Sequence, residues 1–245
     1  MKNEMEIKSL GNDLYFSIII PAHNEEDYIY ETLSKLENLN YPKDKFEVIV
    51  VENGSKDKTN EIIDDFKKTT KLDMQVAKLE KNGVSAAKNF GARLINSNTQ
   101  WLIFLDADTH LEKDFLKELN ELITKMRDVV IIATSLRPLN DSFKARAWFN
   151  FYNFGRWVSQ SSMSIQIVRK DIFKKIKFDE SLTFNEDLTL IKKAKKFGKF
   201  YYFWTDKVYT STRRFDKVGY MKQFIIWVWW NIIPERRKIK YPVIR

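Results

Sequence analysis

The chain has 245 residues, of which 44% are hydrophobic and 31% charged, and its net charge is +9. This length and composition predict one large folded domain or one domain with an appendage, and they exclude a disordered chain and a polytopic membrane protein. With no cysteine and only two histidines, the chain cannot form disulfides or a soft-ligand metal site, so a bound metal would be Mg²⁺ or Mn²⁺ on oxygen ligands.

Segments of strand and helix character alternate along the first half of the sequence. Short apolar or β-branched runs predict strands at residues 16–20, 46–51, 74–79 and 101–105. Apolar side chains at helical spacing lie between these runs, as at Ile29, Leu33 and Leu36. Such alternation builds a mostly parallel sheet with helices on its faces, so the first half predicts an α/β fold.

The second half is less regular and ends in a basic, aromatic segment. Its patterns predict strands at residues 129–133, 163–168 and 200–204 and helices at 187–197 and 216–233, the last one amphipathic and aromatic. Residues 138–162 are polar and aromatic and predict only loops that shape an acceptor region. No repeat or linker divides the chain, so we expect one domain at residues 1–212 and a tail at 213–245.

Polar clusters follow the first, second and fourth predicted strands, where an open α/β sheet binds its ligands. They lie at residues 21–26, 52–57 and 106–110. Asp106 and Asp108 matter most, because two carboxylates at the end of a buried strand repel each other unless a cation compensates. A divalent cation that bridges them to a diphosphate meets that need, and the alternative is that the acids only cap the next helix.

The turn after the second strand contains both structural and candidate binding residues. Asn53 and Gly54 form a turn signal, and Ser55 or Asp57 can cap the following helix. Glu52 directly follows apolar strand positions, which a turn does not explain. We therefore interpret its carboxylate as an acceptor for an N–H group of a nucleobase.

Five sequence motifs together resemble one enzyme family. In the order and spacing typical of family 2 glycosyltransferases with the GT-A fold, the sequence contains IIIPAHNEE, VVENGSKDKT, GVSAAKNFGA, WLIFLDAD and FNEDLTLIKKAKKFG. The resemblance covers residues 16–212. It implies an enzyme that takes a sugar from a nucleotide-sugar donor with the help of Mg²⁺ or Mn²⁺ and inverts the anomeric carbon.

The resemblance assigns the donor to the loops after the first, second and fourth strands and to a helix that begins within residues 83–93. The donor-binding residues that it implies are Pro21, Ala22, His23, Glu25, Glu52, Asn53, Lys88, Asp106 and Ala107. Asn53 stands where the family has a second acid, so the choice between a UDP-sugar, which we favour, and a GDP-sugar stays open. Lys88 replaces the usual arginine and keeps its charge without the bidentate fork.

The metal ligands that the resemblance implies are Asp106 and Asp108, with His110 as a third ligand unless it is a solvated loop histidine. The metal would neutralise the charge that builds on the leaving diphosphate. Arg213 and Arg214 follow a predicted strand. We expect them to close over the diphosphate from the other side, and the alternative is an exposed basic turn.

Asp187 is the predicted catalytic residue. The pair Glu186-Asp187 resembles the Glu-Asp motif of the family, in which the aspartate removes the proton of the acceptor hydroxyl. A general base contributes roughly 10²–10⁴-fold, although acids in a first helical turn are also favoured by the helix dipole. A polyprenyl phosphate acceptor needs no base, so Asp187 favours a hydroxyl acceptor on a glycan or a glycolipid over that alternative.

Two other functions compete with a glycosyltransferase. A nucleotidyltransferase of related fold also binds a nucleotide and Mg²⁺, but it needs a Gly-rich loop with a basic residue where this chain has Pro-Ala-His-Asn-Glu-Glu. A catalytically degenerate protein that binds a membrane or a glycan is the alternative from a non-enzyme class. Ile226 stands where processive relatives have an arginine, which argues against a processive synthase.

The C-terminal segment combines aromatic residues with most of the net charge. Residues 213–245 contain nine Lys or Arg and two acids, a net +7 of the chain's +9, which leaves +2 for the first 212. Tryptophans beside basic residues fit a helix that lies in an anionic membrane surface. The alternatives are an acceptor-binding wall or a dimer interface. Binding of single-stranded nucleic acid is a lesser alternative. No apolar run reaches the ~20 residues that span a bilayer, and residues 1–14 hold no signal peptide, so we expect a cytoplasmic protein, peripheral at the inner face of the cell membrane.

Overall fold

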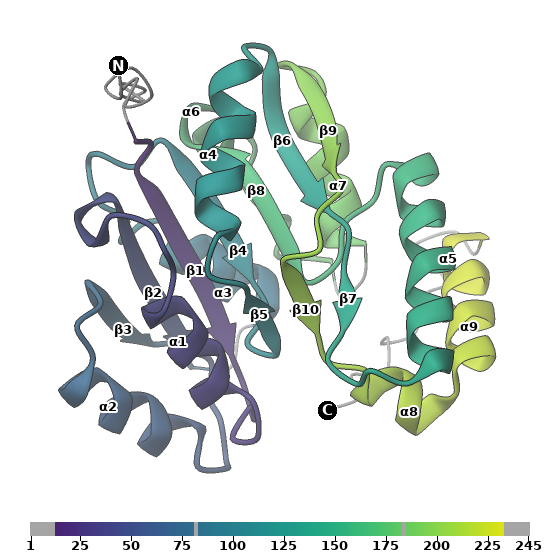
Figure 1. Ribbon diagram of the computed structural model, residues 1–245, viewed down its shortest axis with the longest axis horizontal. Helices are drawn as coiled ribbons and strands as arrows, with labels where there is room; N and C mark the ends of the chain where they lie inside the picture. The colour runs from purple at the N-terminus through teal and green to yellow at the C-terminus, as the bar shows by residue number, and fades with distance from the viewer. Residues whose placement is uncertain (1–12, 81–82, 183–184, 233–245) are drawn as a thin grey trace, which may run out of the picture.

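A seven-stranded sheet forms the centre of the described chain, with the strand order β3-β2-β1-β4-β8-β6-β9. The computed structural model describes residues 13–80, 83–182 and 185–232 (Figure 1). Neighbouring strands run parallel except around β8, which is antiparallel to both β4 and β6. The strands are β1 (Phe16–Ala22), β2 (Phe46–Glu52), β3 (Met74–Lys78), β4 (Trp101–Leu105), β6 (Val129–Thr134), β8 (Ile165–Arg169) and β9 (Lys199–Phe203). The prediction of a mostly parallel sheet is confirmed.

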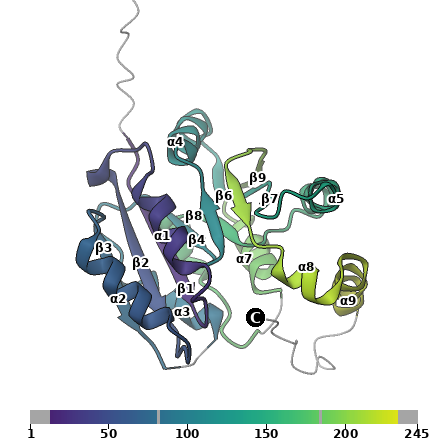
Figure 2. The ribbon, with the colours of Figure 1, turned by 60° about the horizontal axis from the view of Figure 1, so that its bottom comes forward.

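Helices cover both faces of this sheet, as Figures 1 and 2 show from two directions. One face carries α1 (Ile29–Glu37), α2 (Thr59–Thr69) and α4 (Phe115–Lys125). The other face carries α3 (Val84–Gly91), α6 (Lys170–Ile176) and α7 (Glu186–Ala194). A short 3-10 turn, η1 (Lys43–Lys45), leads into β2. The predicted α/β fold is therefore confirmed.

The apolar runs of the central strands follow from this double cover. Along β1, Phe16, Ile18 and Ile20 pack into the core under α1, whereas Ile19 packs into the core under α3. Side chains alternate between the two faces of a strand, so a strand with a core on each side is apolar at nearly every position. Such strands place their carboxyl ends, with the polar loops that follow them, at one edge of the sheet.

A second, three-stranded sheet lies beside that edge. Its strands are β5 (Thr109–Leu111), β7 (Arg137–Pro138) and β10 (Val208–Thr210), in the order β5-β10-β7. The backbone N–H of Ser211, just beyond β10, donates to the carbonyl oxygen of Asp108 at 3.1 Å. This sheet therefore brings a segment from the end of the described chain against the turn that follows β4.

The stretch at residues 138–162 is a helix over most of its length, where only loops were expected. Helix α5 (Phe143–Ser159) begins at Ser142, whose hydroxyl accepts the backbone N–H of Ala145, and ends at Gln160, which has a φ of 50°. Its sequence is rich in Phe, Trp and Tyr, which have modest helix propensity, and its apolar residues occur on every side. A helix without a single apolar stripe lacks the signal that sequence periodicity detects.

The single helix expected at 216–233 is two helices, because Gly219 interrupts it with a φ of 93°. The chain forms α8 (Arg213–Val218) and α9 (Tyr220–Ile232), and residue 233 lies outside the described residues. Three rings of this segment, those of Phe215, Tyr220 and Phe224, lie within 5.7–6.1 Å of the Trp148 ring on α5. These ring contacts pack α8 and α9 against α5.

No helix in the part of the chain that the structure describes is long and apolar enough to cross a membrane. The division of the chain at residue 212 stays a prediction. Arg213 begins α8 directly after the three-stranded sheet.

The close approach of α3 to the sheet gives a test of the core. A Cβ added at Gly91 would lie 2.5 Å from a methyl carbon of Ile19 and 3.0 Å from one of Val51. We expect Gly91→Ala to lower the free energy of unfolding by about 1–3 kcal/mol, as overpacking does. Gly155→Ala on α5, where a Cβ meets nothing within 4 Å, should instead raise it by about 0.5–1 kcal/mol. Urea unfolding measures both, and equal effects would contradict this packing.

Candidate active site

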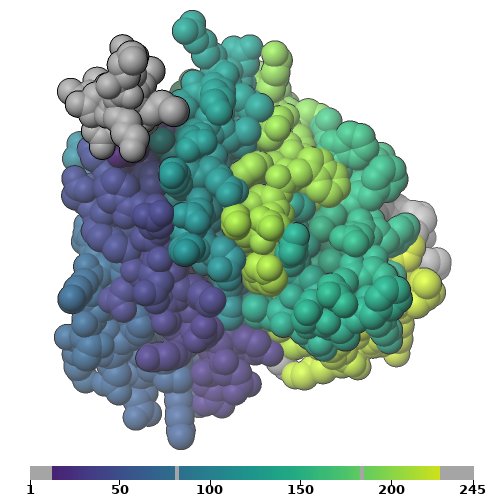
Figure 3. All heavy atoms as spheres, in the orientation of Figure 1, coloured from purple at the N-terminus to yellow at the C-terminus, as the bar shows by residue number. Residues whose placement is uncertain are grey.

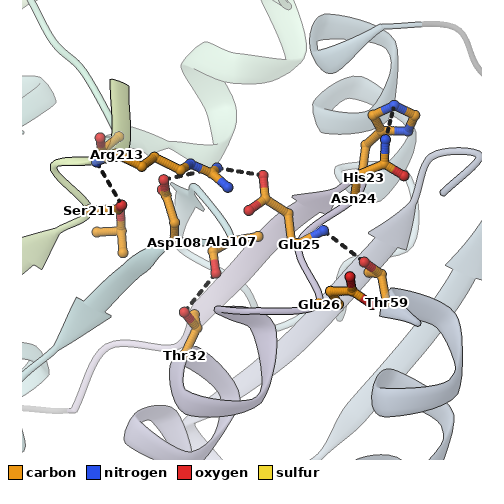
Figure 4. Close-up of polar contacts among 12 residues, drawn as sticks. His23, Asn24, Glu25, Glu26, Thr32, Thr59, Ala107, Asp108, Ser211 and Arg213 are labelled. Atoms are coloured by element: carbon orange, nitrogen blue, oxygen red, sulfur yellow. Dashed lines mark hydrogen bonds and ion pairs between the residues drawn. The ribbon is translucent and has the colours of Figure 1, made fainter. Parts of the chain in front are cut away.

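The turn between β4 and β5 holds Asp106, Ala107 and Asp108 in place. The backbone N–H of Asp106 donates to the carbonyl oxygen of Ser164 at 2.8 Å, and the Thr32 hydroxyl on α1 donates to that of Ala107 at 2.7 Å (Figure 4). The backbone of the turn is thus tied to β8 on one side and to α1 on the other. Both aspartate side chains are half-buried at the edge of the sheet where the sequence predicts ligand binding.

Arg213 joins this turn to the loop after β1. One guanidinium nitrogen lies 2.7 Å from Oε1 of Glu25 and 3.0 Å from Oδ2 of Asp108 (Figure 4). The guanidinium also lies over the Tyr28 ring, 4.8 Å from its centroid. A residue near the end of the described chain therefore binds two acids that precede it by more than 100 positions. Its expected contact with the diphosphate stays a prediction.

The acids around Arg213 carry more negative charge than the arginine balances. The pKa of Asp108 is raised to about 7, because burial, with Asp106 and Glu25, outweighs the opposing effect of Arg213 and Arg214. Glu25 is only 6% exposed, and its second carboxylate oxygen has no hydrogen-bond partner among the described residues. More negative charge is gathered here than the arginine satisfies, which is the condition that a further cation would relieve.

The loop after β1 is locked to the loop after β2. Asn24, at a φ of 54°, accepts the backbone N–H of Lys56 on its side chain and donates its own backbone N–H to the Ser55 hydroxyl. The Nδ1 atom of His23 lies 2.7 Å from the carbonyl oxygen of Asn53. Pro21 and Ala22 lie in the last two positions of β1, paired with β2. These bonds fix the backbone that the sequence assigns to the nucleoside.

Glu52 and Asn53 are both buried at the end of β2, at 4% and 5% exposure. One carboxylate oxygen of Glu52 accepts the backbone N–H of Ser55, and the backbone N–H of Asn53 donates to the carbonyl oxygen of Ala22. Glu52 therefore stabilises its own turn, a role that the sequence analysis did not give it. Its contact with a nucleobase stays a prediction.

Lys88 and Asp187 form a buried ion pair that the sequence did not predict. Nζ of Lys88 lies 3.3 Å from Oδ1 of Asp187 and 2.9 Å from Oε1 of Gln166, and 5.0 Å from the centroid of the Phe178 ring. Lys88 is 2% exposed and Gln166 1%. The pair joins α3 to the first turn of α7 across β8, and it gives Lys88 a partner other than the donor.

The environment of Asp187 suits a proton acceptor near neutral pH. Its pKa is raised to about 7, because burial, with Glu186 and Asp106, outweighs the opposing effect of Lys88. Burial lowers the pKa of the Lys88 ammonium group, but Asp187, Asp106 and Glu186 together outweigh this effect and raise it. Asp106 thus acts on both Asp108 and Asp187, which brings the turn after β4 and the start of α7 into one site.

His110 is not brought to the two aspartates. It is 7% exposed on β5, and the charged groups that influence it are Glu31 and Lys35 of α1 and Glu112, while burial lowers its pKa. Among the described residues, no group of three or more His, Cys, Asp or Glu side chains is placed to hold a metal ion. The arrangement offers two carboxylates, which fit a divalent ion that completes its shell with phosphate oxygens and water.

An open pocket of about 600 Å³ adjoins Arg213. Its lining includes Tyr28 from the start of α1, Asn140 from the segment before α5, and Asp216 and Lys217 from α8. The sequence analysis missed Tyr28 and Gln166, since neither belongs to a motif and each meets its partner only through the fold.

Comparison with known proteins supports an enzymatic site. The model of the family described as Glycosyl transferase family 2 matches residues 17–184. The poly(ribitol-phosphate) beta-N-acetylglucosaminyltransferase TarS of Staphylococcus aureus is 32% identical over 117 residues, which are 48% of this chain and 20% of TarS. The minor teichoic acid biosynthesis protein GgaA of Bacillus subtilis is 26% identical over 198 residues, 75% of this chain and 44% of GgaA. The chain thus spans less than half the length of these relatives.

Solved structures show the same architecture. S. aureus TarS 1-349 in complex with UDP-GlcNAc superposes with a TM-score of 0.67 at 25% identity, covering 82% of this chain and 59% of that one. The mannosyltransferase PcManGT from Pyrobaculum calidifontis, in complex with GDP-Man and Mn²⁺, gives a TM-score of 0.66 at 18% identity, covering 87% and 64%. The second likeness is one of fold alone.

The Arg213 contacts predict a measurable loss of stability. We expect Arg213→Met to lower the free energy of unfolding by about 2 kcal/mol, because it leaves Glu25 and Asp108 largely buried without their cation. Arg137→Met is the matched control, since its ion pair with Asp206 is about half exposed and should be worth less than about 1 kcal/mol. Urea unfolding without ligands measures both, and equal losses would contradict the bridging role of Arg213.

Proposed function

The chain belongs to glycosyl transferase family 2, and from this premise we propose that it is a metal-dependent, inverting glycosyltransferase. It moves a sugar from a nucleoside diphosphate sugar to a hydroxyl group of a glycan or glycolipid. One set of contacts carries the proposal. Lys88 binds both Asp187 and Gln166, and Gln166 pairs in the sheet with Phe104 of β4, the strand that leads directly into Asp106 and Asp108, so the candidate base and the candidate metal ligands lie at the same end of this strand pair.

The donor lies, in this proposal, over the carboxyl ends of β1, β2 and β4. Asp106 and Asp108 would hold Mg²⁺ or Mn²⁺, which would supply positive charge for the leaving diphosphate. Arg213 is already beside Asp108, within reach of diphosphate oxygens near that turn, and Arg214 adds positive charge next to it. The presence of Mn²⁺ with GDP-Man in PcManGT supports the metal on the level of fold.

The nucleoside contacts come from the interlocked loops after β1 and β2. His23 and Glu52 are the candidates for the base, and Pro21 and Ala22 supply backbone at the end of β1. A UDP-sugar is favoured over a GDP-sugar, since TarS was solved with UDP-GlcNAc at 25% identity and PcManGT with GDP-Man at 18%. The positive charge of Lys88 favours the anionic donor, and its ion pair holds Asp187 in position.

Asp187 is the general base of the proposed reaction. It accepts the proton of the acceptor hydroxyl as that oxygen attacks the anomeric carbon, and a pKa of about 7 matches this task at neutral pH. Lys88 and, through it, Gln166 hold the carboxylate in position. A buried base held in this way is superfluous for a polyprenyl phosphate acceptor, whose oxygen is already ionised.

A hydroxyl acceptor in the cell envelope fits the relatives. TarS is named for poly(ribitol-phosphate), and GgaA for minor teichoic acid biosynthesis. We propose an acceptor of this general class, a glycan or a lipid-linked polymer, reached from the inner face of the cell membrane. A degenerate binding protein is disfavoured, because it has no use for a carboxylate whose pKa is tuned to neutral pH.

Donor binding tests the metal assignment. We expect UDP-GlcNAc to raise the melting temperature more strongly with Mn²⁺ than without it, because Asp106 and Asp108 would hold the ion and the ion would strengthen binding of the diphosphate. Asp108→Asn should abolish the Mn²⁺-dependent part of this shift. His110→Gln is the control and should keep it, since the fold does not gather His110 with the aspartates. A shift that Asp108→Asn leaves intact would refute the metal assignment. The same measurement with GDP-Man shows whether the protein prefers a uracil or a guanine nucleotide.

Loss of the general base should slow transfer without weakening donor binding. We expect Asp187→Asn to lower kcat by roughly 10²–10⁴-fold, and Glu186→Gln, the neighbouring acid of the same helical turn, to lower it far less. In the unmodified enzyme, kcat/KM should fall as the pH drops below about 7, because protonated Asp187 cannot accept a proton. Initial rates and donor titrations measure these effects, and near-normal transfer by Asp187→Asn would end the assignment.

A further inference from the structure

Helix α5 is apolar on two opposite sides, and only one of them is packed. Its inner side contacts the sheet region through buried Ala145 and Phe149. Its outer side exposes large apolar residues that recur at helical spacing: Phe143 at 80%, Phe151 at 53%, Phe154 at 56%, Trp157 at 47% and Val158 at 62%. A helix of a water-soluble surface is polar on its outer side, so this side of α5 has the composition of a contact surface.

The exposed surface continues onto two neighbouring elements. The Phe224 ring of α9 lies 5.8 Å from that of Phe151, and Trp204 beyond β9 lies 6.4 Å from Trp157. Figures 1 and 3 show α5 and α9 side by side at the rim of the molecule. The α5–α9 face, as we name it, consists of the five α5 residues above with Trp204 (53% exposed), Met221 (64%) and Ile225 (60%).

Charge on these helices has a single sign. The sequences of α5 and α9 contain no Asp or Glu, although 33 of the 245 residues of the chain are acidic. Lys144 and Lys222 are exposed on the two helices, and in the sequence Arg236, Arg237 and Lys238 follow α9 closely. An apolar surface with a cationic border complements a surface that is apolar inside and anionic at its boundary.

A second copy of the chain fits this surface poorly. Two-fold association would set the α5–α9 face against itself, which brings like charges together and costs free energy. An anionic bilayer offers hydrocarbon to the aromatic residues and phosphate groups to the lysines, and each basic residue near such a surface contributes about 1 kcal/mol. The sign of the charge therefore decides between the two occupants.

We propose that the α5–α9 face is a docking surface for an anionic lipid bilayer, with both helices lying in the plane of the interface. This inference goes beyond the proposed function and does not rest on it. Helix α8, which begins at Arg213, packs against α5 through Phe215 and Phe149, 5.6 Å apart. Helix α8, which also lines the pocket beside Arg213, thus packs on the inner side of the helix that carries the docking surface, which suits an acceptor carried by a lipid.

Vesicle flotation of the full chain tests the docking surface. The probes are vesicles of phosphatidylglycerol with phosphatidylcholine and vesicles of phosphatidylcholine alone. We expect binding to the anionic vesicles, weakened at least tenfold by the double substitution Phe154→Ser and Trp157→Ser on α5. Tyr30→Ser is the matched control, because Tyr30 is 59% exposed and belongs to α1, which Figure 1 shows well to the left of α5.

Two further measurements make the result decisive. Lys144→Glu with Lys222→Glu should also weaken binding, and thermal melting should show that each variant keeps its fold, because all four side chains are exposed. Binding that the α5 substitutions leave unchanged, or equal binding to neutral vesicles, overturns the proposal. So does sedimentation showing a dimer that the α5 substitutions dissociate, which would assign the face to a second copy. None of these readouts depends on sugar transfer, so a failure here is distinguishable from a failure of the proposed function.

Discussion

Repulsion among buried carboxylates is the constraint on which this site depends. Asp106, Asp108 and Asp187 are gathered at one edge of the sheet, and two cations from distant parts of the chain oppose their charge. Arg213 binds the acid of the turn after β4, and Lys88 binds the acid at the start of α7. The pKa values of Asp108 and Asp187 remain raised to about 7 in spite of these partners. This unrelieved negative charge supports both the proposed metal ion and the proposed general base.

The architecture explains why these groups meet. Parallel strands end at a common edge, so the loops after β1, β2 and β4 are neighbours although they are far apart in sequence. In the three-stranded sheet, β10 pairs with β5, which follows the turn after β4. Arg213, just after β10, therefore lies beside Asp108. Antiparallel β8 supplies Gln166 from the middle of the sheet. Its side-chain oxygen accepts a hydrogen bond from the buried ammonium group of Lys88.

The segment from β10 to α9 links chemistry to the proposed docking of the protein. Its first helix begins with the arginine that binds Glu25 and Asp108, and its second contributes to the α5–α9 face. The aromatic rings around Trp148 hold both helices on α5.

The sequence by itself determined the α/β fold, the edge of the sheet that carries the candidate site, and the choice of Asp106 and Asp108 as residues to examine. These features are local: apolar runs make strands, and polar loops follow them. Asp187, in contrast, was singled out only by the resemblance to the family. Helix α5 escaped detection because it has no single apolar stripe, and the break at Gly219 because apolar residues continue on both sides of it. Tertiary structure alone decided that Lys88 pairs with Asp187 and that Arg213 bridges Glu25 and Asp108. Such pairings join positions about 100 residues or more apart, and only the path of the folded chain sets which charges are close enough to interact.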